Sequence, residues 1–252
     1  MRTTSMPPVL SVIIPTLNEE KLLGSVLAVY TTELRQRYHV EVIVSDGGST
    51  DATLQMADDH ADTVLRHNGT HRQTIAEGRH AGALGAHGDV LVFINGDTVP
   101  ANPERFFHTL TQFANRSGPY RRASALACPV LVDPAERVVM DTVVHTVFNW
   151  YVWLLNALRI GAGRGECQVV RRDVYMAVGG YRVGLAAGED FDLFGRISRK
   201  ARVRFAWELL VHESPRRFRK FGYFRILYWW AVNAMSVLLR GRSSSDEWEP
   251  VR

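Results

Sequence analysis

The fold of this chain is decided by the stretch Asp89-Val90-Leu91-Val92-Phe93-Ile94-Asn95-Gly96-Asp97-Thr98. A continuous apolar run of strand length that ends in a polar turn is typical of a strand buried in a parallel sheet. In an open α/β sheet, ligands bind at the carboxyl ends of such strands. A carboxylate beside a glycine offers oxygen ligands and a close backbone approach, so this turn is a candidate cation site. Taken alone, the same turn is also explained as a polar cap on a core strand.

Composition limits the class of protein. The 252 residues are 46% apolar and 22% charged, which suits one large globular domain or two halves that share a core. The formal charge of +4 comes mainly from residues 159–172 and 196–242. This uneven distribution favours an anionic ligand or a membrane surface as partner and argues against nucleic acid. With only Cys128 and Cys167, we expect buried thiols and neither a disulfide framework nor a zinc site.

The termini and two apolar stretches bear on localisation. Residues 1–8 are polar and proline-bearing, without the apolar core of a signal peptide, so we expect a flexible N-terminus and a cytoplasmic protein. The apolar stretches 142–158 and 226–239 are shorter than the roughly 20 residues that span a bilayer as a helix. Neither is therefore predicted to be a transmembrane helix. The polar residues 243–252 are predicted to be disordered.

Strands and helices alternate in the first half of the chain. Buried-strand patterns cover residues 10–14, 40–44 and 89–94, with a short edge strand at 63–66. Three segments have helical spacing. The first covers residues 22–34 and follows a cap at Asn18; the second ends at His60 and is capped by Ser49, Thr50 or Asp51; the third covers residues 70–86. This order predicts a doubly wound parallel half.

The crossovers of such a half place the loops after its parallel strands on one edge of the sheet. Thr16, Asp46 and Asp97 should therefore converge there. No G-x-G-x-x-G follows the first strand, which argues against a dinucleotide cofactor and leaves a mononucleotide-sized cleft with carboxylates.

The second half of the chain is less regular. Its predicted elements are helices at 102–115, 138–158, 189–200 and 216–242, and strands at 124–132, 166–171 and 203–211. The stretch 216–242 is amphipathic, rich in aromatic residues and flanked by Arg and Lys. It is predicted either as an interfacial helix lying on a membrane or as a core helix, and both alternatives stay open at this point. Phe148, Trp150, Tyr151 and Trp153 pose the same question for the helix 138–158.

Five motifs share an order and spacing with a known family. They are Ser11-Val12-Ile13-Ile14-Pro15-Thr16-Leu17-Asn18-Glu19, Asp46-Gly47-Gly48-Ser49-Thr50-Asp51, Arg79-His80-Ala81-Gly82, Asn95-Gly96-Asp97 and Gly188-Glu189-Asp190-Phe191-Asp192-Leu193. Over residues 9–220 the chain resembles the family-2 glycosyltransferases with the GT-A fold, a superfamily that includes the dolichyl- and polyprenyl-phosphate sugar synthases. The resemblance implies an α/β, Rossmann-like, mostly parallel sheet flanked by helices, with a nucleotide-sugar half at 9–98 and an acceptor half at 99–215.

The resemblance also implies a nucleotide-sugar donor, a divalent metal such as Mn2+ or Mg2+, and inversion at the anomeric carbon. The donor-binding positions it carries over are Pro15, Thr16 and Glu19 for the nucleoside, Asp46 for the base, Arg79 near the base or diphosphate, and Asn95, Gly96 and Asp97 at the metal. The chain departs from the family's Asp-x-Asp at its first position, where Asn95 brings an amide oxygen without charge. Asp97 then remains as the essential metal ligand.

Catalytic and clamping residues are carried over from the later motifs. Asp190 matches the family's base, with Glu189 and Asp192 beside it; three acids in a first helical turn could instead stabilise only the helix dipole, by about 0.3–1 kcal/mol each. His212 is a candidate second metal ligand, or a structural histidine at a strand end. Arg216 and Arg217 are candidate phosphate clamps, or part of a basic face that contacts a membrane.

The predicted activity is transfer of a sugar from a nucleotide-diphosphate sugar to an acceptor, with a polyprenyl phosphate or other lipid among the candidate acceptors and a peripheral contact with the inner face of the membrane as an open alternative. Two other functions remain open as alternatives. A sugar-phosphate nucleotidyltransferase needs a glycine-rich, basic loop after the first strand, whereas residues 15–20 are acidic. A non-catalytic membrane-surface binding module is favoured by Asn95 and disfavoured by Asp97 and Asp190.

Overall fold

The computed structural model describes residues 9–185 and 187–240, and its centre is a seven-stranded sheet. The sheet has the order β3-β2-β1-β4-β8-β6-β9, in which β1 to β4 run parallel and β8 runs antiparallel to both neighbours. Its strands are β1 (Leu10–Thr16), β2 (Val40–Asp46), β3 (Thr63–Arg66), β4 (Val90–Ile94), β6 (Ala125–Ala127), β8 (Cys167–Arg171) and β9 (Val203–Phe205). The predicted α/β class and the edge position of residues 63–66 are confirmed.

A second, three-stranded sheet corrects two strand predictions. It consists of β5 (Thr98–Pro100), β10 (Val211–Glu213) and β7 (Val130–Val132), with β10 in the middle. The predicted strands 124–132 and 203–211 each divide between the two sheets. The first breaks at Pro129, which has no backbone N–H to donate; the second breaks at the 3-10 turn η1 (Trp207–Leu209). Periodicity alone does not show such a change of sheet.

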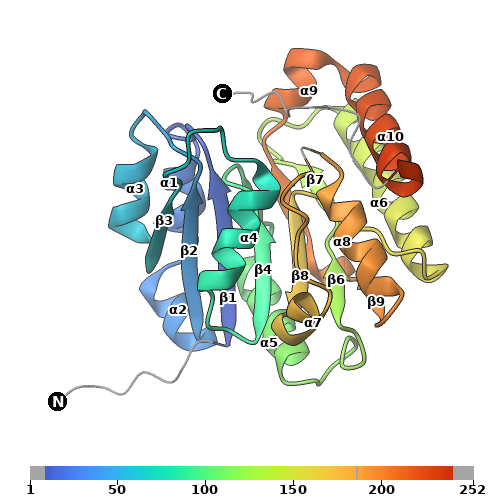
Figure 1. The fold of residues 1–252 in the computed structure, drawn as a ribbon, viewed down its shortest axis with the longest axis horizontal. Coiled ribbons are helices and arrows are strands. Elements are labelled where there is room, and N and C mark those ends of the chain that lie inside the picture. Colours follow the sequence, from blue (N-terminus) through green and yellow to red (C-terminus); the bar gives the residue numbers. More distant parts are fainter. Residues whose placement is uncertain (1–8, 186, 241–252) are drawn as a thin grey trace.

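Helices cover both faces of the main sheet (Figure 1). Alternate residues of β1 face opposite cores: Val12 and Ile14 belong to the same core as Phe107, and Ile13 belongs to the same core as Phe194. The first core includes residues of α1 (Leu23–Ala28), α2 (Thr32–Tyr38), α3 (Thr53–His60) and α5 (Pro103–Ala114); the second includes residues of α4 (Ile75–Gly85), α6 (Val139–Ala157), α7 (Arg172–Ala177) and α8 (Glu189–Ser198). As Figure 1 shows, α4 and α8 lie in front of the sheet.

The predicted helix 22–34 is two helices, because Thr31 starts α2 by accepting a hydrogen bond from the Leu34 amide at 3.2 Å. Asn18 does not cap α1. It adopts a left-handed conformation, and its Oδ1 accepts from the Thr50 amide at 2.8 Å, which joins the loops after β1 and β2. The helix 70–86 begins later than predicted, at a capping box between Thr74 and Glu77.

The C-terminal segment is also two helices, α9 (Arg216–Phe221) and α10 (Tyr223–Arg240). They are separated by Gly222, whose φ of +75° favours glycine. Residues 1–8 and 241–252 lie outside the described residues, as do the predictions made for them. Within the described residues, no helix has the length and apolar character needed to cross a membrane.

Candidate active site

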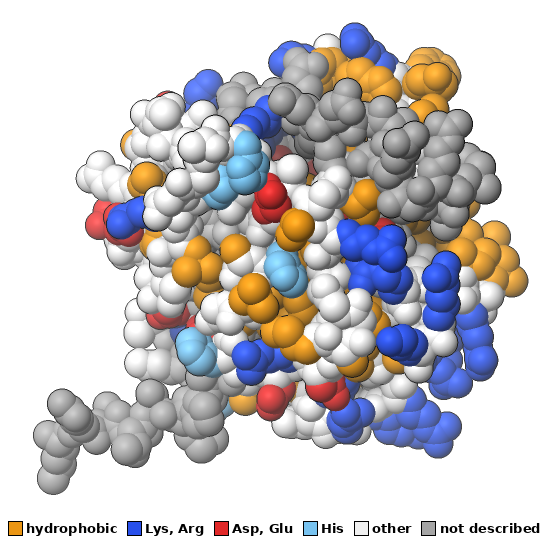
Figure 2. All heavy atoms as spheres, viewed as in Figure 1, with side chains coloured by type: hydrophobic (Ala, Val, Ile, Leu, Met, Phe, Trp, Pro, Cys, Tyr) orange, Lys and Arg blue, Asp and Glu red, His pale blue; other side chains and the backbone are white. Residues whose placement is uncertain are grey.

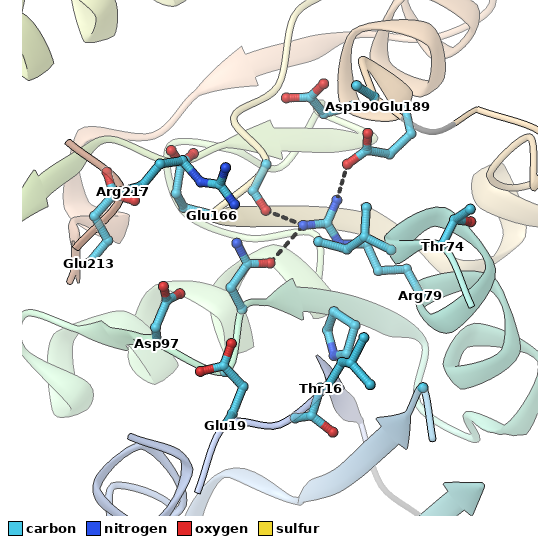
Figure 3. Close-up of a pocket in the computed structure, with 18 of the residues that line it drawn as sticks. Thr16, Glu19, Thr74, Arg79, Asp97, Glu166, Glu189, Asp190, Glu213 and Arg217 are labelled. Atoms are coloured by element: carbon cyan, nitrogen blue, oxygen red, sulfur yellow. Dashed lines mark hydrogen bonds and ion pairs between the residues drawn. The ribbon is translucent and has the colours of Figure 1, made fainter. Parts of the chain in front are cut away.

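Side chains at the carboxyl ends of β1 and β4 and at the starts of α8 and α9 enclose a cavity of about 440 Å³ (Figure 3). The predicted site residues that line it are Pro15, Thr16, Glu19, Arg79, Asn95, Gly96, Asp97, Glu189, Asp190, Arg216 and Arg217. Asp46, Asp192 and His212 are not among the lining residues. The convergence of the loops after β1 and β4 follows from the parallel register of these strands.

Asp46 supports the part of the cavity wall formed by Thr16 and Gly47. It is buried, and its Oδ2 accepts hydrogen bonds from the Gly48 and Ser49 amides at 2.9 Å each. Its Oδ1 accepts from Thr16 Oγ1 at 3.5 Å. These bonds fix the tight turn after β2, so that Gly47 is the residue that faces the cavity.

A buried arginine joins two walls of the cavity. Arg79 is fully buried; its Nη1 donates to Glu189 Oε1 at 2.8 Å and its Nη2 to Asn95 Oδ1 at 2.8 Å. Nη2 also donates to the Gly165 carbonyl. Figure 3 shows the guanidinium between the end of β4 and the start of α8. The oxygen of Asn95 is thus used by Arg79, and the charge of Arg79 is balanced by Glu189.

Asp97 and Glu19 converge on one cation, Arg216. The Nη2 atom of Arg216 lies 2.9 Å from Asp97 Oδ2 and 2.7 Å from Glu19 Oε1, and Nη1 donates to Glu19 Oε2 at 2.8 Å. The Asp97 carbonyl accepts from the Ser214 amide at 3.2 Å, which holds this turn against the end of β10. The carboxylates of Glu19 and Asp97 share the Arg216 guanidinium, and their combined negative charge favours a cation between them.

The acids at the start of α8 differ in their surroundings. Burial and, next, the charge of Glu189 raise the pKa of Asp190 to about 8. Asp190 lines the cavity and accepts a hydrogen bond from the Phe191 amide at 2.9 Å. Asp192 instead forms ion pairs with Arg182 at 3.1 Å and Arg196 at 2.6 Å, outside the cavity. We therefore assign Asp192 a structural role and leave it out of the proposed catalytic group.

The far end of the cavity holds residues that the sequence analysis missed. Glu166 and Glu213 line it, and Arg164 behind them pairs with Glu166 at 3.1 Å. Glu213 Oε1 lies 3.4 Å from the Nε2 atom of His145. Burial and the charge of Glu166 raise the pKa of Glu213 well above its usual range. Glu213 could have been found by its position at the carboxyl end of a short strand, the signal that selected Asp97, whereas Glu166 lies before the first residue of β8 and gives no such signal.

His212 neighbours Glu213 on β10 but does not line the cavity. Burial lowers the pKa of His212, which is half-buried. Among the described residues, no three His, Cys, Asp or Glu side chains are grouped to hold a metal ion. We therefore leave His212 out of the proposed metal site.

The open, mostly parallel sheet with an acidic turn at the end of its central strand is the architecture of the GT-A type, in which ligands bind at the carboxyl ends of the strands. Residues 11–117, less than half of the chain, match the family described as glycosyl transferase family 2. This part of the chain is thus similar to the family that the motifs predicted, and it contains the first four of those motifs.

One curated relative is validoxylamine A glucosyltransferase from Streptomyces hygroscopicus subsp. limoneus. It is 31% identical over 136 residues, which cover 52% of this chain and 29% of the relative. The chain thus spans less than a third of the length of this relative.

Solved structures share the fold at low sequence identity. A mannosyltransferase from Pyrobaculum calidifontis in complex with GDP-Man and Mn2+ is 19% identical with a TM-score of 0.61, covering 83% of this chain and 58% of its own. Glucosyl-3-phosphoglycerate synthase from Mycobacterium tuberculosis, in complex with Mn2+, UDP and phosphoglyceric acid, is 20% identical with a TM-score of 0.59, covering 92% of this chain and 78% of its own. These likenesses confirm the GT-A fold.

Proposed function

We propose that this protein transfers a sugar from a nucleotide-diphosphate sugar to an acceptor hydroxyl or phosphate oxygen. The observation that carries the proposal is that one cavity holds Asp97, at the end of β4, together with Asp190, at the start of α8. The family match favours glycosyl transfer over nucleotidyl transfer. Solved proteins of this fold that bind GDP-Man or UDP support a nucleotide-sugar donor.

The donor would lie along the β1 side of the cavity. Its nucleoside would contact Pro15, Thr16 and Gly47, where glycine permits close approach because a Cβ at Gly47 would meet the Thr16 carbonyl at 3.3 Å. Arg217 lines the same cavity and would contact the diphosphate. Arg79 would act mainly by fixing Asn95 and Glu189, because both of its terminal nitrogens already donate to protein oxygens.

The residues present fit a divalent cation bound together with the donor. Asp97 and Glu19 already converge on the charge of Arg216, and donor oxygens would complete the ligand set. Asp97 would hold the ion, which would supply stabilisation of negative charge on the leaving diphosphate. Arg216 would then be released from Asp97 and face the diphosphate.

Asp190 would act as the base of a single displacement. The acceptor oxygen forms a bond to the anomeric carbon while the bond from that carbon to the diphosphate oxygen breaks. The proton of a hydroxyl acceptor passes to Asp190, whereas an ionised phosphate acceptor attacks without a proton to transfer. Attack from the face opposite the leaving group inverts the configuration. Glu189 would hold Arg79 and raise the basicity of Asp190 through its charge.

The acceptor would enter at the far end of the cavity. Phe148, Phe218 and Trp230 line that end, with ring centroids of Phe148 and Trp230 5.0 Å apart. An apolar wall beside Arg217 suits an acceptor with both an apolar and an anionic part, such as a polyprenyl phosphate.

Isothermal titration with UDP, GDP and their sugars, with and without Mn2+, tests the donor site. We expect one nucleotide to bind in a metal-dependent manner, and Asp97→Ala to weaken this binding by at least about tenfold. Asp192→Asn, which changes an acid outside the cavity, is the matched control and should bind as the wild type does. If no nucleotide binds in the presence of metal, the donor site is wrong and the non-catalytic binding module becomes the better reading.

Asp190→Asn separates binding from chemistry. It should keep nucleotide affinity within a few-fold and reduce product formation by about 100-fold or more. Full activity in this variant would refute the assignment of the base.

A further inference from the structure

Helix α6 buries mainly polar side chains and exposes mainly apolar ones. Its buried positions are mostly polar, at Asp141, His145, Asn149 and Asn156. Asn149 exchanges hydrogen bonds with the backbone of Val130 at 3.1 and 3.0 Å. Val152 is buried on the same side, and Phe148 and Leu155 pack against the core. The helix is thus held to the domain largely through polar side chains, unlike a typical surface helix in a globular protein.

The remaining polar positions have equally specific partners. Asp141 pairs with Arg219 and accepts from the Tyr223 hydroxyl at 2.7 Å, which ties α6 to α9 and α10. Asn156 donates to the Ala162 carbonyl at 2.8 Å and accepts from its amide at 3.0 Å. These bonds fix the rotation of α6 about its axis, so its outward face is determined by contacts on the inner side.

The outward face of α6 is mostly apolar and also carries the exposed Thr142 and Thr146. The exposed large side chains of this face, called here the α6 stripe, are Val139, Met140, Val143, Val147, Trp150, Tyr151, Trp153, Leu154 and Leu158. Val139 is 82% exposed, Val147 65% and Trp150 53%. Single exposed apolar residues are ordinary, but a contiguous row over five helical turns marks an interaction surface.

The rim of the stripe carries positive charge. Trp207 contacts Trp150, with ring centroids 5.1 Å apart, and extends the stripe to β9, where Arg202 and Arg204 are exposed. Arg159 is exposed at the C-terminal end of the stripe. Figure 2 shows Lys and Arg side chains gathered beside hydrophobic ones on the right of the view, where Figure 1 draws α6 and β9.

The neighbouring helices add to this character. The sequences of α9 and α10 contain no Asp or Glu, and Lys220 and Arg225 are exposed on them. Phe224 is 93% exposed and Tyr228 67% exposed on α10. Aromatic residues and cations around an apolar row are the composition of a surface that binds the headgroup region of an anionic bilayer.

We propose that the α6 stripe docks on the surface of an anionic lipid bilayer, with the basic residues at its rim contacting lipid phosphates. A second copy of this chain is a poorer occupant, because two rims of the same sign would repel each other across the interface. The inference does not depend on the proposed catalysis. Phe148, which lines the cavity, lies on α6, the helix that carries the stripe, and Trp230, which also lines the cavity, lies on the neighbouring α10.

Flotation of the purified protein with lipid vesicles tests the docking. Vesicles of phosphatidylcholine with about 30% phosphatidylglycerol should carry the protein, and pure phosphatidylcholine vesicles should carry several-fold less, because each basic residue near the surface adds to binding. Val147→Glu should reduce partitioning by about tenfold or more. Leu84→Glu is the matched control, since Leu84 is 60% exposed on α4, on another part of the surface.

Each outcome decides the proposal. Circular dichroism should show both variants folded, because both positions are exposed. Equal partitioning of Val147→Glu and Leu84→Glu, or a wild type that stays off the anionic vesicles, would overturn it. The proposal would also be overturned if light scattering showed a wild-type dimer that does not bind vesicles and that Val147→Glu, but not Leu84→Glu, converts to a monomer. The stripe would then bind a second copy of the chain. Donor titration reads out the proposed function separately.

Discussion

The charge of Glu189 should set the pH dependence of the reaction through Asp190. With a pKa of about 8, Asp190 is about one-tenth ionised at pH 7 and about nine-tenths ionised at pH 9. Only the ionised carboxylate accepts the acceptor proton. We therefore expect kcat/KM, which reports the free enzyme, to rise about tenfold from pH 7 to pH 9.

Glu189→Gln should move this profile to lower pH. The substitution removes the negative charge that disfavours ionised Asp190 and leaves the positive charge of Arg79 without its ion-pair partner. Both changes favour the ionised form, so the pKa of Asp190 should fall by on the order of one unit or more. The ratio of kcat/KM at pH 9 to that at pH 7 should then drop from about tenfold to about twofold or less.

The assay is release of the nucleoside diphosphate from the donor that titration identifies, with water as the acceptor, measured between pH 6 and pH 9. Asp192→Asn is the control, because Asp192 belongs to the same helical turn but pairs with Arg182 and Arg196. It should keep the tenfold ratio. A wild-type ratio near one, or a Glu189→Gln profile that moves to higher pH, would refute the assignment of base and modulator.

Three further substitutions test the packing around the site. Arg79→Ala should lower the free energy of unfolding by about 3–5 kcal/mol in denaturant melts, because it leaves a buried acid unpaired. Asp141→Asn should lower the free energy of unfolding by about 2 kcal/mol at pH 7. Burial of Asp141 raises its pKa, but the hydrogen bonds from Arg219, the Val138 amide and Tyr223 outweigh burial and lower the pKa from 3.8 to about 2. This stabilisation is present above pH 4 and should fade as the pH falls towards 2. Gly82→Ala should lower the melting temperature, because its methyl group would overlap Cγ2 of Ile13 where α4 crosses β1.

The first half of the fold could be predicted because its signals are local. Each strand of the parallel half is a β-branched run, and each ends in a polar turn whose position the run fixes. The parallel connection then places Thr16 and Asp97 at one edge without knowledge of any contact. The same rule would have found Glu213, had residues 203–211 been divided at the 3-10 turn.

What could not be predicted depends on partners distant in sequence. Arg216 lies 197 positions from Glu19, and no periodicity links the two. Asn18 is a residue type that often caps helices, but its side-chain oxygen instead accepts a hydrogen bond from the Thr50 amide, 32 positions away. The inverted face of α6 is a third case: its spacing predicts a helix, but which side is buried is decided by Arg219 and Val130.

The substitution of Asn for Asp at position 95 follows from the buried arginine beside it. Arg79 is fully buried and carries one positive charge, which Glu189 balances. An aspartate at 95 would place a second negative charge on the same guanidinium, and that excess charge would raise the pKa of Asp190 further. A neutral amide accepts the hydrogen bond of Arg79 without this cost. The neutral amide of Asn95 thus adds no charge near Asp190, which the proposed mechanism needs in its ionised form, and Asp97 remains the carboxylate of this turn.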